Sequence, residues 1–417
     1  MMTRAKAPSS ETRAQASPGV ASATASTFAS NSSNLDLNAH GNLDFDVGLA
    51  SLCLERLAGQ RVAVAMSGGV DSAVAALRLK EAGALPVGLS LRLHDPDPDN
   101  PAAPRACCPP DDLQDARRVA EALDIPFYVV DARSAFGDQV VRPFVDAYLA
   151  GRTPNPCVGC NSFVKLDTLY RRAMGLGCAA LATGHFARVT RDAQGKTRLF
   201  TGRDANKDQS YFLFGLSPAI LNTLVFPIGE LTKADVRARA VSAGLPIAHK
   251  LESQEVCFVG GAGAGDFVMR QPGAAGDHRG PIRDASGQVL GEHEGVMRFT
   301  VGQRRGLGVS SSTPLYVLNI DAKEKTLTVG ARAELGRRGL MASGASWISG
   351  RPTEPVRVTA RIRYRDRGTP ATAYALDDER VRVEFDRPAF AVAKGQAVVF
   401  YQGPEVLGGA WIEEALP

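Results

Sequence analysis

A short segment rich in glycine and serine, SGGVDS at 67–72, is the first feature of this sequence that could do chemistry. It lies between a valine-rich apolar run at 61–66 and a stretch with helical spacing at 73–83. Two glycines let the backbone turn tightly against a ligand, and N–H groups at the start of a helix attract anions. Neither the Walker pattern nor the dinucleotide fingerprint is formed. The segment therefore predicts a different phosphate loop, in which Asp71 could orient a bound Mg²⁺.

Cysteines are the second chemical feature. Cys157 and Cys160 form a C-x-x-C pair inside GRTPNPCVGCN at 151–161, where the prolines and asparagines predict a loop. Cys257 lies much later, in ESQEVCFVGG. Such thiols could be a redox pair or part of a zinc or iron–sulfur site, and inert buried thiols are the alternative. Of the other cysteines, Cys178 is interpreted as a buried inert thiol, Cys107 and Cys108 as surface thiols in a proline-rich loop, and Cys53 as incidental.

Composition limits the classes of protein that could carry these residues. The chain has 417 residues, 7 cysteines and a formal charge of +4. This length is typical of two or three domains. The cysteines are too few for a disulfide scaffold, and no apolar run reaches the ~18–20 residues of a membrane span. We therefore expect a cytoplasmic protein without a membrane partner, in which the important thiols are reactive or bind metal.

Strands and helices alternate in the first part of the chain. Strands are predicted at 61–66, 86–93, 125–131 and 179–184, and helices at 73–83, 111–124 and near 162–175. This alternation is typical of a parallel sheet with helices on both faces. Later the pattern becomes β-rich, with a hairpin at 314–321 and 326–330 and strands at 356–365, 380–385 and 397–403. A small antiparallel barrel or sandwich is expected at the C-terminus.

These patterns divide the chain into four parts. Residues 1–57 are rich in Ala, Ser, Thr and Asn and predict a disordered tail, whose basic first half leaves a mitochondrial address as an alternative. A phosphate-loop domain is expected at 58–265, a small central domain at 266–335 and a β-barrel at 336–417. Arginines concentrate in the last two parts and predict an RNA-contacting surface. They are Arg304, Arg305, Arg337, Arg338, Arg361, Arg363, Arg365 and Arg367.

Several motifs occur in a characteristic order from about residue 60 to 417. They are AMSGGVDS (65–72), GRTPNPCVGCN (151–161), ATGHFAR (182–188), KDQSYFL (207–213), SQEVCF (253–258), FTVGQRRGLG (299–308) and RYR (363–365). With them the chain resembles the tRNA-specific 2-thiouridylases (MnmA or TrmU type) of the PP-loop ATP pyrophosphatases. The resemblance implies an α/β class protein: a PP-loop parallel-sheet domain, a small central domain and a C-terminal antiparallel β-barrel.

The resemblance also implies an activity, that of a tRNA-uridine 2-sulfurtransferase. ATP would adenylate the C2 oxygen of the wobble uridine, AMP and pyrophosphate would be released, and a persulfide would supply the sulfur. Cys257 would carry the persulfide and Cys160 would be the nucleophile, with a disulfide formed between them. The partners would be tRNA and a persulfide donor such as a cysteine desulfurase or a relay protein, and the enzyme would be a monomer.

Each part of the implied site has its own residues. ATP would bind Ala65, Met66, Ser67, Gly68, Gly69, Val70, Asp71, Ser72, Leu91 and Gly184. The target base would meet Asn155, Pro156 and Cys157. Other tRNA contacts would be Lys207, Asp208, Gln209, Arg363 and Tyr364. His185 could lie near the adenylate or be a hydrogen-bonded histidine at a strand end.

Two questions stay open at this point. Many relatives have Asp where this chain has Cys157, and a thiol has a pKa of about 8.5 rather than about 4, so an acid/base role there is open. Cys157, Cys160 and Cys257 could instead hold a [4Fe–4S] cluster. Two other functions remain as alternatives, another PP-loop adenylating ligase and an RNA-binding protein without catalysis.

Overall fold

The computed structural model describes residues 54–95, 110–192, 194–251, 256–259 and 263–417. The tail expected at 1–57 lies outside this part of the chain except for its last four residues, and Leu54 is buried in a core. Cys53, Cys107 and Cys108 also lie outside it. No helix in the described ranges is both long enough and apolar enough to span a membrane.

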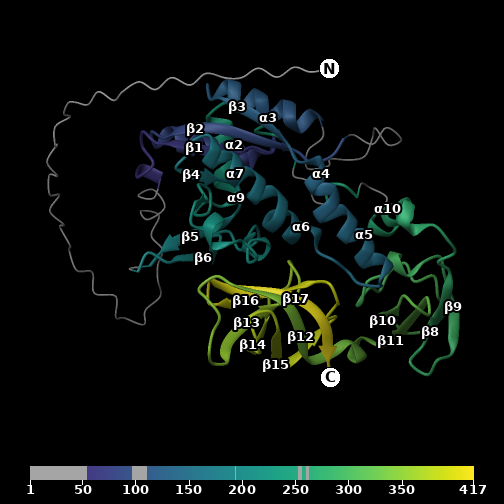
Figure 1. The fold of residues 1–417 in the computed structure, drawn as a ribbon. Helices are drawn as coiled ribbons and strands as arrows, with labels where there is room; N and C mark the ends of the chain where they lie inside the picture. The colour runs from purple at the N-terminus through teal and green to yellow at the C-terminus, as the bar shows by residue number, and fades with distance from the viewer. Residues whose placement is uncertain (1–53, 96–109, 193, 252–255, 260–262) are drawn as a thin grey trace, which may run out of the picture. The chain divides into compact units, whose positions relative to one another are not determined.

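A parallel sheet of five strands forms the first domain (Figure 1). Its strand order is β3 (Phe127–Asp131), β2 (Leu85–Arg92), β1 (Arg61–Ala65), β4 (Ala180–Ala182) and β7 (Leu224–Val225). The central strands are mostly apolar and buried between their ends because helices cover both faces of such a sheet. The four predicted strands are confirmed. The chain adds β2 and β3 on one side of β1 and β4 on the other, so the strand order reverses beside β1.

Helices surround this sheet, and two stretches are continuous helical runs. The described helices are α2 (Val70–Glu81), α3 (Pro110–Ala122), α4 (Arg133–Phe136), α5 (Arg142–Leu149), α6 (Pro156–Gly159), α7 (Leu166–Gly175), α8 (Pro218–Leu221), α9 (Lys233–Ser242) and α10 (Ala264–Met269). The π-helical turns η1 (Gly137–Val141) and η2 (Cys160–Lys165) join α4 to α5 and α6 to α7. The predicted helices are confirmed as α2, α3 and η2–α7.

The prediction of a loop at 151–161 is wrong for the second half of this range. Helix α6 begins at Pro156 and passes directly into η2. Proline is compatible with the first position of a helix because no N–H group is needed there and its φ angle is already helical. The prolines thus mark a helix start rather than an extended loop.

A four-stranded sheet forms the central part, in the order β10 (Tyr316–Asp321), β11 (Thr326–Gly330), β8 (Gly280–Arg283) and β9 (Val289–His293). The predicted hairpin is confirmed as the antiparallel pair β10–β11. One side of the sheet has its own apolar core, which includes Ile282, Val317 and Leu327. The boundaries expected at residues 265 and 335 stay predictions.

Six antiparallel strands close into the C-terminal barrel (Figure 1). They are β12 (Gly336–Trp347), β15 (Val381–Phe390), β14 (Thr369–Ala375), β13 (Val356–Arg361), β16 (Ala397–Gln402) and β17 (Glu405–Leu416), with β12 paired to β17. Strand β17 also pairs with β6 (Thr197–Thr201), whose partner is β5 (Ala187–Arg191). A hairpin that follows β4 in the chain therefore extends the barrel sheet.

Candidate active site

The loop after β1 is closed by its own hydrogen bonds. The hydroxyl of Ser72 donates to the carbonyl of Gly69 at 2.9 Å and accepts from the N–H group of Ser67 at 3.2 Å. Gly68 has a φ of +70°, and a Cβ there would lie 2.2 Å from the backbone oxygen of Asp112. Only glycine fits this position. The first turn of α2 follows, whose N–H groups have no helical acceptor and attract phosphate.

Strand β4 ends against the same helix terminus. A Cβ on Gly184 would lie 2.7 Å from backbone atoms of Asp71 and Ser72, so glycine allows the close approach. The ends of β1 and β4 therefore bracket the start of α2 at the reversal of strand order, where α/β proteins bind ligands. Leu91 lies two residues beyond the partner of Ala65 on β2 and is buried. The structure thus places the predicted ATP residues along one edge of the sheet.

Lys233 is a candidate that the sequence reasoning missed. Its Nζ lies 2.6 Å from Oδ1 of Asp71, and only 11% of its side chain is exposed. It begins helix α9, where Thr232 and Asp235 form a capping box. That Thr-x-x-Asp pattern marks a helix start in the sequence but says nothing about the distant partner. The structure therefore adds a nearly buried cation to the phosphate loop.

Metal binding would require several ligand side chains close together. Within the described ranges, no three His, Cys, Asp or Glu side chains are grouped so that they could hold a metal ion. The arrangement therefore does not fit a [4Fe–4S] cluster on Cys157, Cys160 and Cys257. Mg²⁺ needs fewer protein ligands because nucleotide phosphates supply the others. Its place beside Asp71 stays a prediction.

Cys157 and Cys160 lie on one helical stretch. Asn155 is the extended residue before α6, and Pro156 occupies the first helical position. Cys160 follows three residues after Cys157, a spacing that places two side chains on the same helix face. Cys160 is only 7% exposed, and Cys157 is half-buried. The side-chain amide of Asn161 donates to the carbonyl of Cys157 at 3.0 Å and braces this turn.

Cys257 is brought to the same core as Cys160. Its neighbour Phe258 packs edge-on against Phe136 and Phe144, with ring centroids 5.5 and 5.1 Å apart. Cys257 and Phe258 both pack against the apolar core that contains Cys160. Two cysteines almost a hundred residues apart in the sequence therefore share one core. The buried Cys178 is also in this core, and burial raises the pKa of its thiol.

Residues expected to meet the base and the tRNA lie beside one another. The side chain of Asn155 lies beside the hydroxyl of Tyr211, which donates to the carbonyl of Ala397 in the barrel at 2.8 Å. The next residue, Phe212, packs against Tyr364, with ring centroids 4.4 Å apart. The KDQSYFL segment therefore links the cysteine helix to the barrel.

Two expected tRNA contacts are bonded within the protein. Asp208 is 6% exposed, and its carboxylate accepts from Arg361 of β13 at 2.8 Å and from two backbone N–H groups. The guanidinium of Arg361 lies over the ring of Tyr401 at 4.1 Å. Gln209 accepts from the N–H group of Phe186 at 3.0 Å. A tRNA contact through Asp208 or Gln209 stays a prediction, whereas the bonds of Asp208 join the first domain to the barrel.

The strand predicted at 356–365 is confirmed only as far as Arg361. Strand β13 ends there, because the carboxylate of Asp366 accepts hydrogen bonds from two backbone N–H groups and stabilises a turn. Three exposed arginines lie in this turn: Arg363, Arg365 and Arg367. They form a basic turn next to Tyr364 rather than a stripe on a sheet.

His185 lies at the end of β4, near the phosphate loop. Its Nδ1 is 2.8 Å from the hydroxyl of Thr183. Burial and, to a smaller extent, the nearby charge of Lys165 lower the pKa of His185 to about 3. The imidazole is therefore neutral at pH 7, which excludes it as a resting cation for phosphate.

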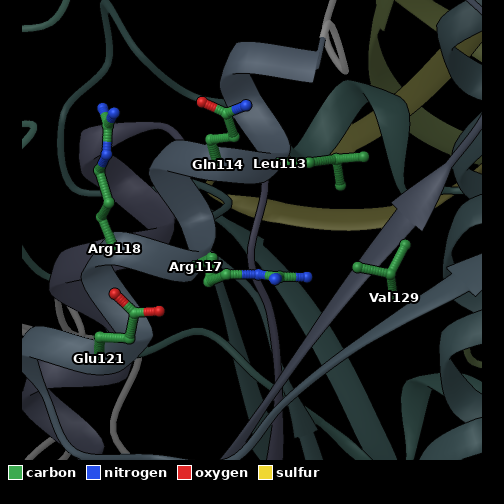
Figure 2. Close-up of a pocket in the computed structure, with 6 residues that line it drawn as sticks. All are labelled: Leu113, Gln114, Arg117, Arg118, Glu121 and Val129. Atoms are coloured by element: carbon green, nitrogen blue, oxygen red, sulfur yellow. The ribbon is translucent and has the colours of Figure 1, made fainter.

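A separate pocket of about 250 Å³ is lined by α3 and β3. Figure 2 shows its lining, Leu113, Gln114, Arg117, Arg118 and Glu121 from α3 with Val129 from β3. None of the predicted site residues lines it. We therefore do not assign it to the candidate active site.

Three family descriptions match consecutive parts of the chain. A tRNA methyl transferase HUP domain matches residues 60–261, a tRNA methyl transferase PRC-barrel domain 266–331 and an aminomethyltransferase β-barrel domain 337–412. The tRNA-specific 2-thiouridylase MnmA of Geotalea uraniireducens is 47% identical over 360 residues, 86% of this chain and 96% of that protein. The chain belongs to the tRNA-specific 2-thiouridylase family. The MnmA of Geobacter metallireducens, also 47% identical, is covered to 98%.

Solved structures resemble this 2-thiouridylase family member only weakly. A 4-thiouridine synthetase–RNA complex with bound ATP aligns with 52% of this chain and 47% of that chain, at 15% identity and a TM-score of 0.33. An NMN synthetase from Francisella tularensis aligns with 50% and 76%, at 19% identity and a TM-score of 0.29. Scores this low carry no argument, so the family assignment depends on the sequence matches.

Proposed function

We propose that this protein is a tRNA 2-thiouridylase that uses ATP to replace the C2 oxygen of the wobble uridine by sulfur. One observation carries the proposal: a phosphate loop and a cysteine pair, Cys160 and Cys257, occur in one chain, and the two cysteines share a core. The family assignment supports the substrate class, since the curated relatives are named tRNA-specific 2-thiouridylases. Cytoplasmic location and a monomeric state stay predictions.

Adenylation is the step that requires the phosphate loop. The C2 carbonyl of uridine is a poor electrophile with a poor leaving group, and its oxygen would attack the α-phosphorus of ATP while the bond to the β-phosphate breaks. The start of α2 would hold the pyrophosphate that leaves. Lys233 would offset its negative charge, with Asp71 then available to a Mg²⁺ ion.

Sulfur transfer is the step that requires the cysteines. The outer sulfur of a persulfide on Cys257 would attack C2, and AMP would leave with the original oxygen. Cys160 would then attack the inner sulfur of Cys257, which releases 2-thiouridine and leaves a Cys160–Cys257 disulfide. Alternatively, Cys160 would first release sulfide from the persulfide. In both routes a thiol reductant must reduce the disulfide and a persulfide donor must reload Cys257.

The target base would be bound beside the KDQSYFL segment at 207–213, which links the first domain to the barrel. Wobble bases lie in single-stranded loops and can be turned out of the stack. Asn155 and Cys157 would contact such a base, and Phe212 and Tyr364 offer aromatic faces nearby. The exposed turn arginines would bind phosphates, so tRNA binding should weaken as salt rises.

The assay combines the purified protein with ATP, a persulfide donor and unmodified tRNA, followed by nucleoside analysis. We expect 2-thiouridine, AMP and pyrophosphate in equal amounts. The Cys257→Ser variant should still release pyrophosphate but form no 2-thiouridine. Pyrophosphate without 2-thiouridine in the unmodified protein would indicate another adenylating ligase. Complete absence of ATP turnover would favour the RNA-binding alternative.

A further inference from the structure

Asp204 uses both oxygens of its carboxylate, and the proposed reaction gives it no role. Its Oδ1 accepts from the N–H group of Asn206 at 3.0 Å, and its backbone carbonyl accepts from the N–H group of Lys207 at 3.0 Å. These two bonds form a turn at the start of the KDQSYFL segment. Its Oδ2 accepts instead from the backbone N–H group of Lys233, also at 3.0 Å. One carboxylate therefore joins the turn that carries Lys207 to a residue 29 positions after Asp204.

The bond to Lys233 lies at the first position of helix α9. Thr232 is the N-cap of this helix, and its side chain accepts from the N–H group of Asp235. The N–H group of Lys233 has no acceptor inside the helix, because the first turn of a helix has no preceding carbonyls. Asp204 supplies that acceptor from outside the helix, and its negative charge is favourable at a helix N-terminus. It therefore fixes the start of α9 as a second cap.

The side chain of Lys233 reaches from this position to the phosphate loop. Its Nζ lies 2.6 Å from Oδ1 of Asp71 and 5.9 Å from the ring centroid of Phe186. Phe186 is bonded in both directions to Gln209: its carbonyl accepts from the N–H group of Gln209 at 2.8 Å, and its own N–H group donates to the Gln209 side chain at 3.0 Å. Asp204 thus binds the main chain of Lys233, and Gln209 binds the residue whose ring lies beside the ammonium.

We propose that Asp204 is a positioning residue, which holds the start of α9 so that the ammonium of Lys233 is in place when ATP enters the phosphate loop. The inference rests on the proposed function, in which Lys233 offsets the charge of the pyrophosphate. A charge that is fixed in advance needs no reorganisation during the reaction, and a displacement of about 1 Å can cost about 100-fold in rate. The same carboxylate caps the turn of Lys207, an expected tRNA contact, so the ATP site and this tRNA segment share one anchor.

The first test is a double-mutant cycle on the rate of pyrophosphate release. Asp204→Ala should lower this rate about tenfold. Lys233→Met should lower it about 30-fold, and the double variant should lose about 30-fold as well, rather than the roughly 300-fold product, because Asp204 acts through that ammonium. Losses that multiply in the double variant, or an unchanged rate in Asp204→Ala, would overturn the proposal.

Asp192→Ala is the matched control. Asp192 caps a turn between β5 and β6 with the same pattern of bonds: its Oδ1 accepts from the N–H group of Gln194 at 3.1 Å, and its carbonyl accepts from that of Gly195 at 2.9 Å. Its Oδ1 also accepts from the N–H group of Lys196 in the same hairpin, whereas Asp204 reaches α9. Loss of this turn cap should leave pyrophosphate release within about twofold of the original rate. An equal loss in the two variants would overturn the role assigned to Asp204.

The second test needs neither tRNA nor ATP, so it decides the matter even if the proposed function fails. Amide hydrogen exchange is followed by mass spectrometry with fragmentation to single residues. Asp204→Ala should speed exchange at the Lys233 amide about fivefold or more, because this amide loses its acceptor, and Asp192→Ala should leave it unchanged. An unchanged rate at Lys233 in Asp204→Ala, with the original circular dichroism spectrum, would overturn the positioning role. Pyrophosphate release without 2-thiouridine in the unmodified protein would count against the proposed function alone.

Discussion

The phosphate loop and the cysteine region of this protein are built in opposite ways. The loop is local: its hydrogen bonds join Ser67, Gly69 and Ser72, all within six positions. The cysteine region is assembled from distant parts, since Cys160 comes from a π-helical turn and Cys257 from a segment almost a hundred residues later. Substitutions in the phosphate loop should therefore change the adenylation rate directly. The sulfur-transfer rate should also respond to substitutions far from the two thiols.

Gly68→Ala should have the largest effect, because it breaks the local region at its tightest point. The new Cβ would meet the backbone of Asp112, and adenylation should fall by at least about 100-fold. Gly177→Ala is the matched control: its φ is +68° but no atom lies within 4 Å, so only a strain of roughly 1–2 kcal/mol is added. Pyrophosphate release assays measure the result. Normal adenylation by Gly68→Ala would contradict the assigned loop.

Lys233→Met tests whether the phosphate loop also depends on a residue that is distant in the sequence. The substitution removes the nearly buried cation that contacts Asp71, and adenylation should fall about 30-fold, roughly 2 kcal/mol. The control is Lys196→Met, since Lys196 is exposed and its Nζ donates to the backbone carbonyl of Ser349. The readout is again pyrophosphate release. Equal rates in both variants would mean that Lys233 serves α9 rather than ATP.

Arg361→Met tests the contact that joins the barrel to the segment beside the cysteine helix. It breaks the bond to the buried Asp208 and the stacking over Tyr401, and should lower the free energy of unfolding by about 3 kcal/mol. Because this contact joins the barrel to the segment beside Asn155, 2-thiouridine per pyrophosphate should also fall. The control on the same strand is Arg357→Met, which removes an exposed pair with Asp386 and should stay near the original protein. Denaturant unfolding that does not distinguish the two variants would contradict the joining role.

His185 should have no effect at neutral pH, so its contribution is seen only as the pH falls. Its pKa is about 3 in the folded protein, against an ordinary value of 6.5, so the unfolded chain takes up the proton first as pH falls. The free energy of unfolding should therefore decrease between pH 6.5 and pH 3, by about 1 kcal/mol per pH unit from this group. Above pH 6.5 it should contribute no slope. In His185→Gln this part of the slope should vanish, and an identical pH profile would refute the assignment.

The same contrast explains which features the sequence could predict. Strand β1, the loop and α2 follow one another in the chain, so spacing alone indicates them. The turn after Arg361 was missed because period two continues past it, and only the capping bonds of Asp366 end the strand. The contact of Lys233 with Asp71 joins residues 162 positions apart, which no local pattern encodes. Motif resemblance indicated the cysteines, but only the fold brings them to one core.

The most direct measurement counts disulfides in a single turnover. Protein loaded with one persulfide on Cys257 is mixed with ATP and unmodified tRNA without reductant, and peptides and nucleosides are quantified together. The account predicts one Cys160–Cys257 disulfide for each 2-thiouridine formed, and no 2-thiouridine from Cys257→Ser. A full yield of 2-thiouridine with both thiols still alkylatable would contradict it.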